Sequence, residues 1–322
     1  MGKQSSKSLA DQLKSYIAPF RYDGSGEFHL KSHRTNEKGG LDKEKGEKII
    51  EANRRRLSDF QEKLYAQDRW SLLLIFQGMD AAGKDSAIKS VFEGVNPQGC
   101  EVTSFKTPSS KELDHDFLWR AAIALPERGR IGIFNRSHYE ECLVVRVHPE
   151  MLAKQKLPPK LVTKDIWRER FEDISCFERY LARNGTVILK FFLNVSRQEQ
   201  RERFLERLEQ PSKNWKFNMG DIAERSLWAK YQAAYQDMIH HTATRHAPWH
   251  IVPADHKWFA RMVIGSAIVS ALDKLDLHFP KVDKAERSEF RQIRQALLDE
   301  DKSRALQKGA SSAKRVGAAT PT

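Results

Sequence analysis

The hydrophobic pattern alternates between short continuous apolar runs and longer segments of helical periodicity. Five runs have the length of buried strands: 72–76, 102–105, 131–134, 186–193 and 250–252. Six segments between and after them space their apolar residues as helices do: 84–95, 111–125, 164–183, 198–208, 221–241 and 256–275. Strands that are buried on both faces are continuously apolar. The alternation therefore predicts an α/β fold with a parallel sheet and helices on both faces.

The two ends of the chain have a different character. Residues 46–70 are charged but carry apolar residues at helical spacing, which predicts an amphipathic helix leading into the core, after an irregular arm over 22–40. Residues 281–308 predict a charged helix, and the small polar residues 309–322 predict a disordered tail. We therefore expect an N-terminal arm and helix over 1–70, a core over 71–278, and an appendage over 279–322.

Charge and composition narrow the class of protein. The 322 residues carry a net charge of +12, which suits an anionic partner such as nucleic acid, a phosphorylated metabolite or an inorganic phosphate polymer. No apolar run approaches the ~20 residues of a membrane span. Three widely spaced cysteines suggest neither a disulfide framework nor a zinc site. We expect a cytoplasmic protein, although Gly2 and Ser6 also fit the short N-myristoylation pattern.

The strongest motif is Gly-Met-Asp-Ala-Ala-Gly-Lys-Asp over 78–85, directly after a predicted strand and before a predicted helix. This Gly-x4-Gly-Lys spacing is typical of a phosphate-binding loop. Its glycines allow a tight turn with backbone N–H groups facing inward, and Lys84 can reach the outer phosphates. The predicted phosphate-binding residues are Gly78, Ala81, Ala82, Gly83, Lys84, Asp85 and Ser86.

Two carboxylates accompany this loop. Asp80 lies within it, and Asp85 takes the place of the usual Ser or Thr after the lysine. Because both would repel a phosphate chain, we expect a Mg²⁺ ion to lie between them and the phosphates. The alternative for Asp80 is a helix N-cap. The same alternative, a helix N-cap, applies to Asp85.

The strand at 131–134 ends in Asn135 and Arg136. P-loop enzymes usually place a metal-contacting carboxylate at such a strand end, and an amide oxygen can substitute for it. Nearby Glu140 and Glu141 could supply the charge, and Arg136 could neutralise a transferring phosphoryl group, unless it forms a structural ion pair. Lys106 ends the preceding strand, where ligands bind in open α/β sheets.

A basic helix and loop follow the fourth strand. We expect residues 197–220 to form a lid that folds cationic groups over the phosphates. Its candidate residues are Arg201, Arg203, Arg207 and Lys216. The alternative is a solvated helix in which Glu199 pairs with Arg203 four residues later.

These blocks, in this order, resemble the polyphosphate kinase 2 family over roughly 16–275. The blocks that carry the resemblance are the phosphate loop and residues 96–99, 104–108, 115–120, 134–140, 214–217 and 247–249. It implies a P-loop kinase fold like that of thymidylate kinases, with three layers and a helical lid. It also implies catalytic roles for Asp80, Lys84, Asn135, Arg136 and Arg203. Many relatives have Asp where this chain has Asn135, so Glu141 joins Asp80 and Asp85 as a candidate metal ligand.

The resemblance implies transfer of a phosphoryl group, reversibly, from inorganic polyphosphate to AMP or ADP with Mg²⁺ or Mn²⁺. The blocks at 115–120 and 135–140 are similar to those of the subgroup that phosphorylates both nucleotides. Two alternatives stay open: an ATP-dependent nucleotide kinase, and a basic P-loop protein that binds nucleic acid. We expect no nucleic-acid partner, because no helix-turn-helix, stacked aromatic motif or zinc module is present. Assembly into a homo-oligomer is compatible with the sequence.

Overall fold

The computed structural model describes residues 9–316, and within them the side chains of 11–215 and 217–300. Its centre is a six-stranded sheet in the order β1-β6-β5-β2-β4-β3. The strands are β1 (Arg21–Tyr22), β2 (Ser71–Gln77), β3 (Cys100–Ser104), β4 (Ile131–Asn135), β5 (Thr186–Asn194) and β6 (Trp249–Pro253). Neighbouring strands are parallel except β1, which is antiparallel to β6. The predicted α/β fold is confirmed, and the five predicted runs coincide with β2 to β6.

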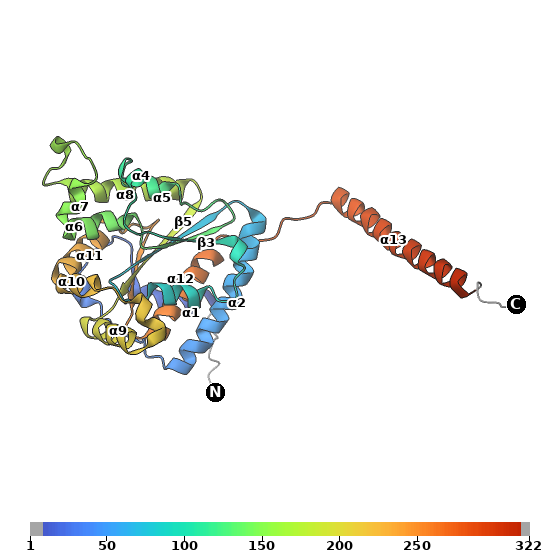
Figure 1. Ribbon diagram of the computed structural model, residues 1–322, viewed down its shortest axis with the longest axis horizontal. Coiled ribbons are helices and arrows are strands. Elements are labelled where there is room, and N and C mark those ends of the chain that lie inside the picture. The colour runs from blue at the N-terminus through green and yellow to red at the C-terminus, as the bar shows by residue number, and fades with distance from the viewer. Residues whose placement is uncertain (1–8, 317–322) are drawn as a thin grey trace, which may run out of the picture. The chain divides into compact units, whose positions relative to one another are not determined.

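Helices cover both faces of this sheet (Figure 1). One layer contains α1 (Leu9–Ile17), α2 (Lys43–Gln67), α3 (Lys84–Val91) and α12 (Lys257–Asp273). The other contains α6 (Val144–Val147), α8 (Ile166–Arg183) and α11 (Trp228–Thr242). Every residue of β2 is buried between the layers. The loop that follows β2 is thus held by the best-covered strand of the sheet.

Some predicted helices are interrupted. The helix expected over 111–125 is wrong as one element, because it divides into α4 (Ser110–Leu113) and α5 (Trp119–Ala122). Between them the Asp116 carboxylate accepts a hydrogen bond from the Leu118 N–H and holds a turn. The segment 221–241 likewise divides into α10 (Gly220–Ser226) and α11, and α3 ends before the left-handed Gly94. Local side-chain-to-backbone bonds of this kind compete with helix formation.

The remaining elements of this part of the chain are the 13-residue helix α9 and several short ones. They are α7 (Pro149–Ala153), α9 (Arg197–Glu209) and the 3₁₀ turns η1 (Ala18–Phe20), η2 (Leu30–Ser32), η3 (Pro97–Gly99), η4 (His138–Cys142), η5 (Pro159–Leu161) and η6 (Pro211–Lys216). Strand β1 starts the arm that we expected to be irregular. Its two residues are too few to show a hydrophobic period, so no pattern in the sequence could predict it.

Of the described residues, those up to 278 form one compact unit, and those from 279 onward form a second. The second unit contains α13 (Lys284–Val316), which continues through residues 309–316 that we expected to be disordered. Residues 317–322 and the N-myristoylation pattern at Gly2 lie outside the described residues. Among the helices that the structure describes, none is both long enough and apolar enough to cross a membrane.

A charged pair lies inside the core of the first unit. Lys190 in β5 donates hydrogen bonds to Glu178 of α8 (2.6 Å), to the Tyr139 hydroxyl (2.9 Å) and to the Thr242 carbonyl (2.8 Å). Tyr139 in turn donates to Glu178 (2.7 Å). Lys190 and Glu178 are fully buried. The pair joins the sheet, η4 and the helices on one face.

Candidate functional site

The loop after β2 bends at residues with left-handed backbone angles. Gly78 has φ 154°, Ala81 φ 60° and Gly83 φ 105°. A Cβ atom on Gly78 would lie 3.0 Å from the Leu193 carbonyl oxygen and 3.2 Å from the Ala82 Cβ, so only glycine fits. Helix α3 begins at Lys84, directly after Gly83. The turn therefore presents backbone N–H groups and a helix N-terminus, as a phosphate-binding loop does.

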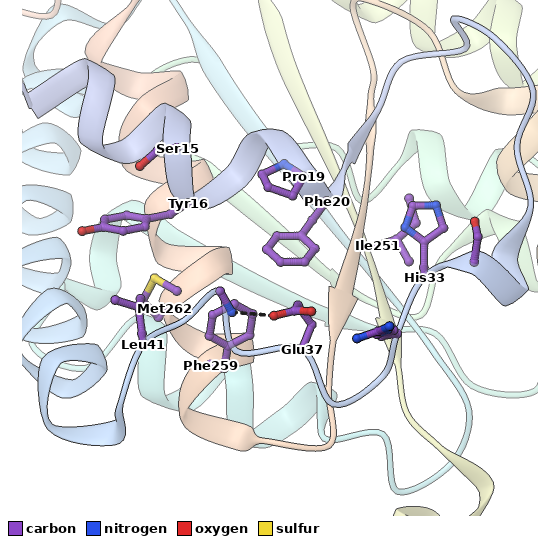
Figure 2. Close-up of a pocket in the computed structure, with 13 residues that line it drawn as sticks. Ser15, Tyr16, Pro19, Phe20, His33, Glu37, Leu41, Ile251, Phe259 and Met262 are labelled. Atoms are coloured by element: carbon purple, nitrogen blue, oxygen red, sulfur yellow. Dashed lines mark hydrogen bonds between the residues drawn. The ribbon is translucent and has the colours of Figure 1, made fainter.

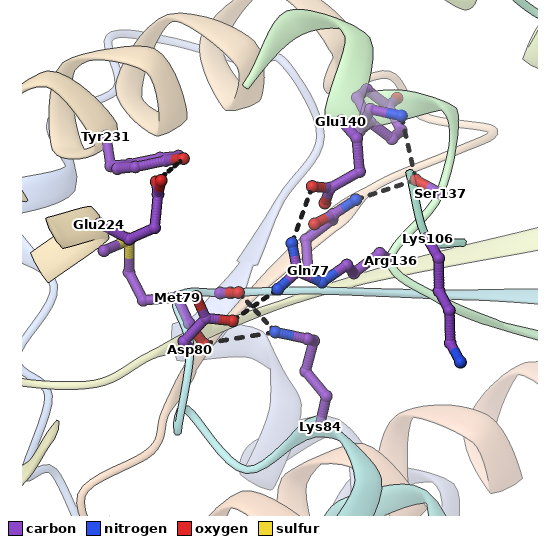
Figure 3. Close-up of polar contacts among 12 residues, drawn as sticks. Gln77, Met79, Asp80, Lys84, Lys106, Arg136, Ser137, Glu140, Glu224 and Tyr231 are labelled. Atoms are coloured by element: carbon purple, nitrogen blue, oxygen red, sulfur yellow. Dashed lines mark hydrogen bonds and ion pairs between the residues drawn. The ribbon is translucent and has the colours of Figure 1, made fainter. Parts of the chain in front are cut away.

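Lys84 folds back over this loop (Figure 3). Its ammonium donates to the carbonyl oxygens of Gly78 (2.6 Å) and Met79 (3.3 Å). The side chain is 8% exposed, and burial, followed by the charge of Arg136, lowers its pKa to about 8. The cation thus lies at the loop itself, where it can reach a bound phosphate.

Arg136 links the loop to the neighbouring strand. Its guanidinium lies 2.5 Å from an Asp80 carboxylate oxygen and 3.1 Å from Glu140 (Figure 3). Its backbone has φ 61°, a strained angle for an arginine, and its N–H donates to the Phe76 carbonyl. Glu140 raises the pKa of Arg136 further, so the guanidinium stays charged. The ion pair that was the alternative to a catalytic role therefore exists, and the same side chain still lines the cavity beside the loop.

Asn135 and Asp85 meet directly across the strand end. The Asn135 amide donates to an Asp85 carboxylate oxygen at 2.5 Å. Asp80 and Asp85 both line the cavity. Within the described residues no three His, Cys, Asp or Glu side chains gather tightly enough to hold a metal alone. Mg²⁺ commonly uses one or two carboxylates together with substrate phosphates, so this donor set fits such an ion.

The loop opens into a cavity of about 890 Å³ between the sheet edge and the segment after α9. Its walls include the phosphate loop, Lys106, Asn135, Arg136, Arg207, Trp215, Phe217, Asn218, Met219 and Asp221. A second cavity, of about 470 Å³, adjoins it and shares Phe105, Lys106, Arg136 and Asn218. The second cavity is more apolar, with Leu113, Val144, Val145 and Met151 in its walls. A strongly charged chamber thus adjoins a less polar one, whose wall still includes charged side chains such as Arg120 and Lys154.

Residues 40–280, more than half of the chain, match the family described as Polyphosphate kinase 2. The chain belongs to the polyphosphate kinase 2 family. A crystal structure of polyphosphate kinase 2 from Arthrobacter aurescens TC1 is 37% identical, with a TM-score of 0.79 over 90% of this chain and 98% of that one. The P-loop kinase fold implied by the resemblance is confirmed, and kinases of this family generally need a divalent metal.

Two curated relatives in this family are also similar over most of their length. ADP-polyphosphate phosphotransferase from Rhodopseudomonas palustris is 48% identical over 80% of this chain and 89% of its own. AMP/ADP-polyphosphate phosphotransferase from Meiothermus ruber is 41% identical over 83% of this chain and 96% of its own.

The structure places two of the predicted site residues of this family member elsewhere. Glu141 is 2% exposed and is paired with Arg120 at 3.0 Å and Arg170 at 3.7 Å, away from the phosphate loop. Burial raises its pKa. Its neighbour Glu140 is the carboxylate that reaches Arg136. In a short 3₁₀ turn successive side chains point in different directions, so the sequence could not decide between the two glutamates.

Arg203, predicted as a catalytic lid residue, does not line the phosphate-loop cavity. Its guanidinium donates to the carbonyl oxygens of Ala81 (2.9 Å), Ala82 (2.7 Å) and Ala254 (2.5 Å), and it is 6% exposed. It therefore holds the phosphate loop from behind. The predicted Glu199 pair is present at 2.7 Å.

Some of the other predicted lid and loop residues line the phosphate-loop cavity, and others do not. Arg207 lines the cavity and lies 3.6 Å from Asp221, whereas Arg201 is exposed and does not line it. The side chain of Lys216 lies outside the part of the chain that the structure describes. The Ser86 hydroxyl donates to the Gly83 carbonyl at 2.9 Å.

Sequence reasoning missed Gln200. Its amide donates to the Asp80 carbonyl at 2.9 Å, which adds a second buried support beneath the loop. The signal available was the helical spacing of Gln200, Arg203 and Phe204, which places them on one face.

Proposed function

We propose that this chain transfers a phosphoryl group from inorganic polyphosphate to AMP and to ADP, forming ADP and ATP, and that the reaction is reversible. The observation that carries the proposal is that Lys84, Arg136 and Asp80 all line the charged cavity at the phosphate loop, with Arg136 paired to Asp80. The names of the two relatives, one for ADP and one for both nucleotides, support the two acceptors.

Catalysis in this site is positional and electrostatic. The loop N–H groups and Lys84 would hold the donor chain, and the acceptor phosphate would supply the attacking oxygen, so no protein nucleophile is needed. Arg136 stays charged and lies where it can offset the charge that spreads over the transferring group. The adjoining apolar cavity would hold the nucleoside.

We infer that Mg²⁺, with Mn²⁺ as a substitute, is the divalent metal. Asp80 and Asp85 would hold it, with Asn135 beside them, and it would neutralise charge on the phosphate chain. Glu140 pairs with Arg136 and so helps to hold the guanidinium beside Asp80.

The test is to incubate the purified chain with Mg²⁺ and long-chain polyphosphate, adding AMP or ADP separately, and to compare ATP as the donor. We expect ADP and ATP to form with polyphosphate, and little product from ATP with AMP. Higher rates with ATP than with polyphosphate would instead indicate an ordinary nucleotide kinase. Binding of duplex or single-stranded DNA in a filter assay, without transfer, would support the nucleic-acid alternative.

A matched pair of lysine variants tests the mechanism. Lys84→Ala should lower kcat by roughly 10²-fold to 10³-fold, since it removes a preorganised charge from the reacting phosphates. Lys89→Ala, on the exposed side of the same helix, should keep the wild-type rate. Full activity of Lys84→Ala would contradict the mechanism.

A further inference from the structure

A separate cavity of about 410 Å³ lies beneath the N-terminal arm (Figure 2). It shares no wall residue with the phosphate-loop cavity. Most of its wall comes from residues 15–39. The cavity therefore lies where the N-terminal arm packs against β6 and α12, and the proposed reaction does not use it.

The inner wall of this cavity is aromatic and apolar. Phe20 from η1 and Phe259 from α12 pack edge to face, with ring centroids 5.6 Å apart. Ile251 of β6, Met262 of α12 and Leu41 extend the apolar surface (Figure 2). Ligand sites typically combine such walls with a few polar groups, in volumes of ~300–1,000 Å³.

The rim supplies the polar groups. Glu37 accepts hydrogen bonds from the N–H groups of Lys38 (2.9 Å) and Gly39 (2.8 Å) through one oxygen, Oε1. These bonds lower its pKa, so the carboxylate is ionised at neutral pH and Oε2 can accept from a ligand. Arg34 is exposed on the same rim and forms no ion pair within the described residues. Burial lowers the pKa of His33, which leaves a neutral imidazole beside them.

Both neighbours of Arg34 are anchored to the sheet. The His33 carbonyl accepts from the Asn194 amide at 2.9 Å. Thr35 donates to the Asp255 carboxylate at 2.7 Å, and the Asp255 N–H donates back to the Thr35 carbonyl at 3.1 Å. The backbone at Arg34 is thus fixed before any ligand arrives, which reduces the entropy lost on binding.

We propose that this cavity binds a nucleoside monophosphate. The base would lie against Tyr16, Pro19 and Leu41, which are partly or fully exposed, above a floor made by the buried rings of Phe20 and Phe259. The phosphate would bind the planar fork of Arg34. The ionised Glu37 would accept a hydrogen bond from a base amino group or a ribose hydroxyl.

Equilibrium dialysis of labelled AMP and labelled adenosine against the full chain tests this site. Arg34→Gln should weaken AMP binding at one site by about tenfold and leave adenosine binding unchanged, because only AMP carries the phosphate. Lys31→Gln is the matched control: it makes the same charge change in the same arm, at an exposed residue outside the cavity wall. It should change neither affinity.

A second variant fills the cavity. Leu41→Trp should remove one AMP site per chain while phosphoryl transfer at the phosphate loop continues. This result does not depend on the proposed reaction. If the chain did not transfer phosphoryl groups, Leu41→Trp would still remove one AMP-binding site. Equal AMP binding by Arg34→Gln and Lys31→Gln, or an equal loss of AMP and adenosine in Arg34→Gln, would overturn the proposal. If Leu41→Trp does not fold, the Arg34 and Lys31 pair decides alone.

Discussion

At the phosphate loop, the charge of Lys84 depends on its surroundings. Burial and the nearby Arg136 lower its pKa to about 8, well below that of an ordinary lysine. The ammonium is charged below this value and neutral above it. A bound polyanion favours the charged form and raises the pKa again.

We therefore predict that kcat/KM for polyphosphate falls as the pH rises through about 8, since the free enzyme then loses the Lys84 charge. The alkaline fall in kcat should come at a higher pH, because kcat reports the complex. In Lys84→Arg, which keeps its charge, the alkaline fall should move above pH 10 even if the rate is lower. An unchanged profile in that variant would assign the fall to another group.

A second prediction concerns the side chain of Asn135. Asn135→Asp replaces the amide that donates to Asp85 with a further carboxylate at the metal site. Because metal affinity rises with the number of charged ligands, half-maximal activity should need roughly fivefold to tenfold less Mg²⁺. Asn184→Asp, which adds the same charge at the end of α8, is the control and should leave the requirement unchanged. The same Mg²⁺ requirement in both variants would remove Asn135 from the metal site.

Among the elements, α9 shows what the sequence could and could not predict. The pattern predicted the helix and its position after β5 correctly. It could not decide which arginine faces the cavity, since Arg201, Arg203 and Arg207 are equally basic. Packing decides: Arg203 is buried beneath the loop, Arg207 lines the cavity and Arg201 is exposed.

Arg203→Gln should destabilise the protein by about 2–4 kcal/mol, because buried loop carbonyls lose their charged donor. Arg201→Gln on the same helix should change the free energy of unfolding by less than about 0.5 kcal/mol. Urea unfolding of both variants measures the difference. If Arg203→Gln lost activity while keeping wild-type stability, the guanidinium would act on the substrate directly, as the sequence alone suggested.

Strands were easier to predict than helices for a physical reason. A strand that is buried on both faces is continuously apolar, and β2, β4 and β5 stand out for this reason. The break between α4 and α5 depends on the Asp116 carboxylate, which accepts a hydrogen bond from the backbone. The spacing of apolar residues gives no indication of this bond. The cavity beneath the N-terminal arm was equally hidden, because it joins Phe20 to Phe259 across most of the chain.

For the whole molecule, the buried pair of Lys190 and Glu178 joins the sheet to one helical layer. Lys190→Met alone should cost about 3–5 kcal/mol, since it leaves Glu178 buried without its partner. Lys190→Met combined with Glu178→Leu should recover most of this loss, because the buried charge is then gone. Chemical unfolding of the single and double variants measures both values. A double variant as unstable as the single one would show that the pair stabilises the fold by more than charge balance.

The strand order has a consequence for synthesis on the ribosome. Ser71 of β2 pairs with Thr186 of β5, 115 residues further along the chain, and its other neighbour β4 also comes later. The apolar segment Leu72–Phe76 therefore leaves the exit tunnel long before either partner strand can cover it. During that interval a nascent chain exposes its most hydrophobic stretch, which makes this segment the natural place for a chaperone to bind.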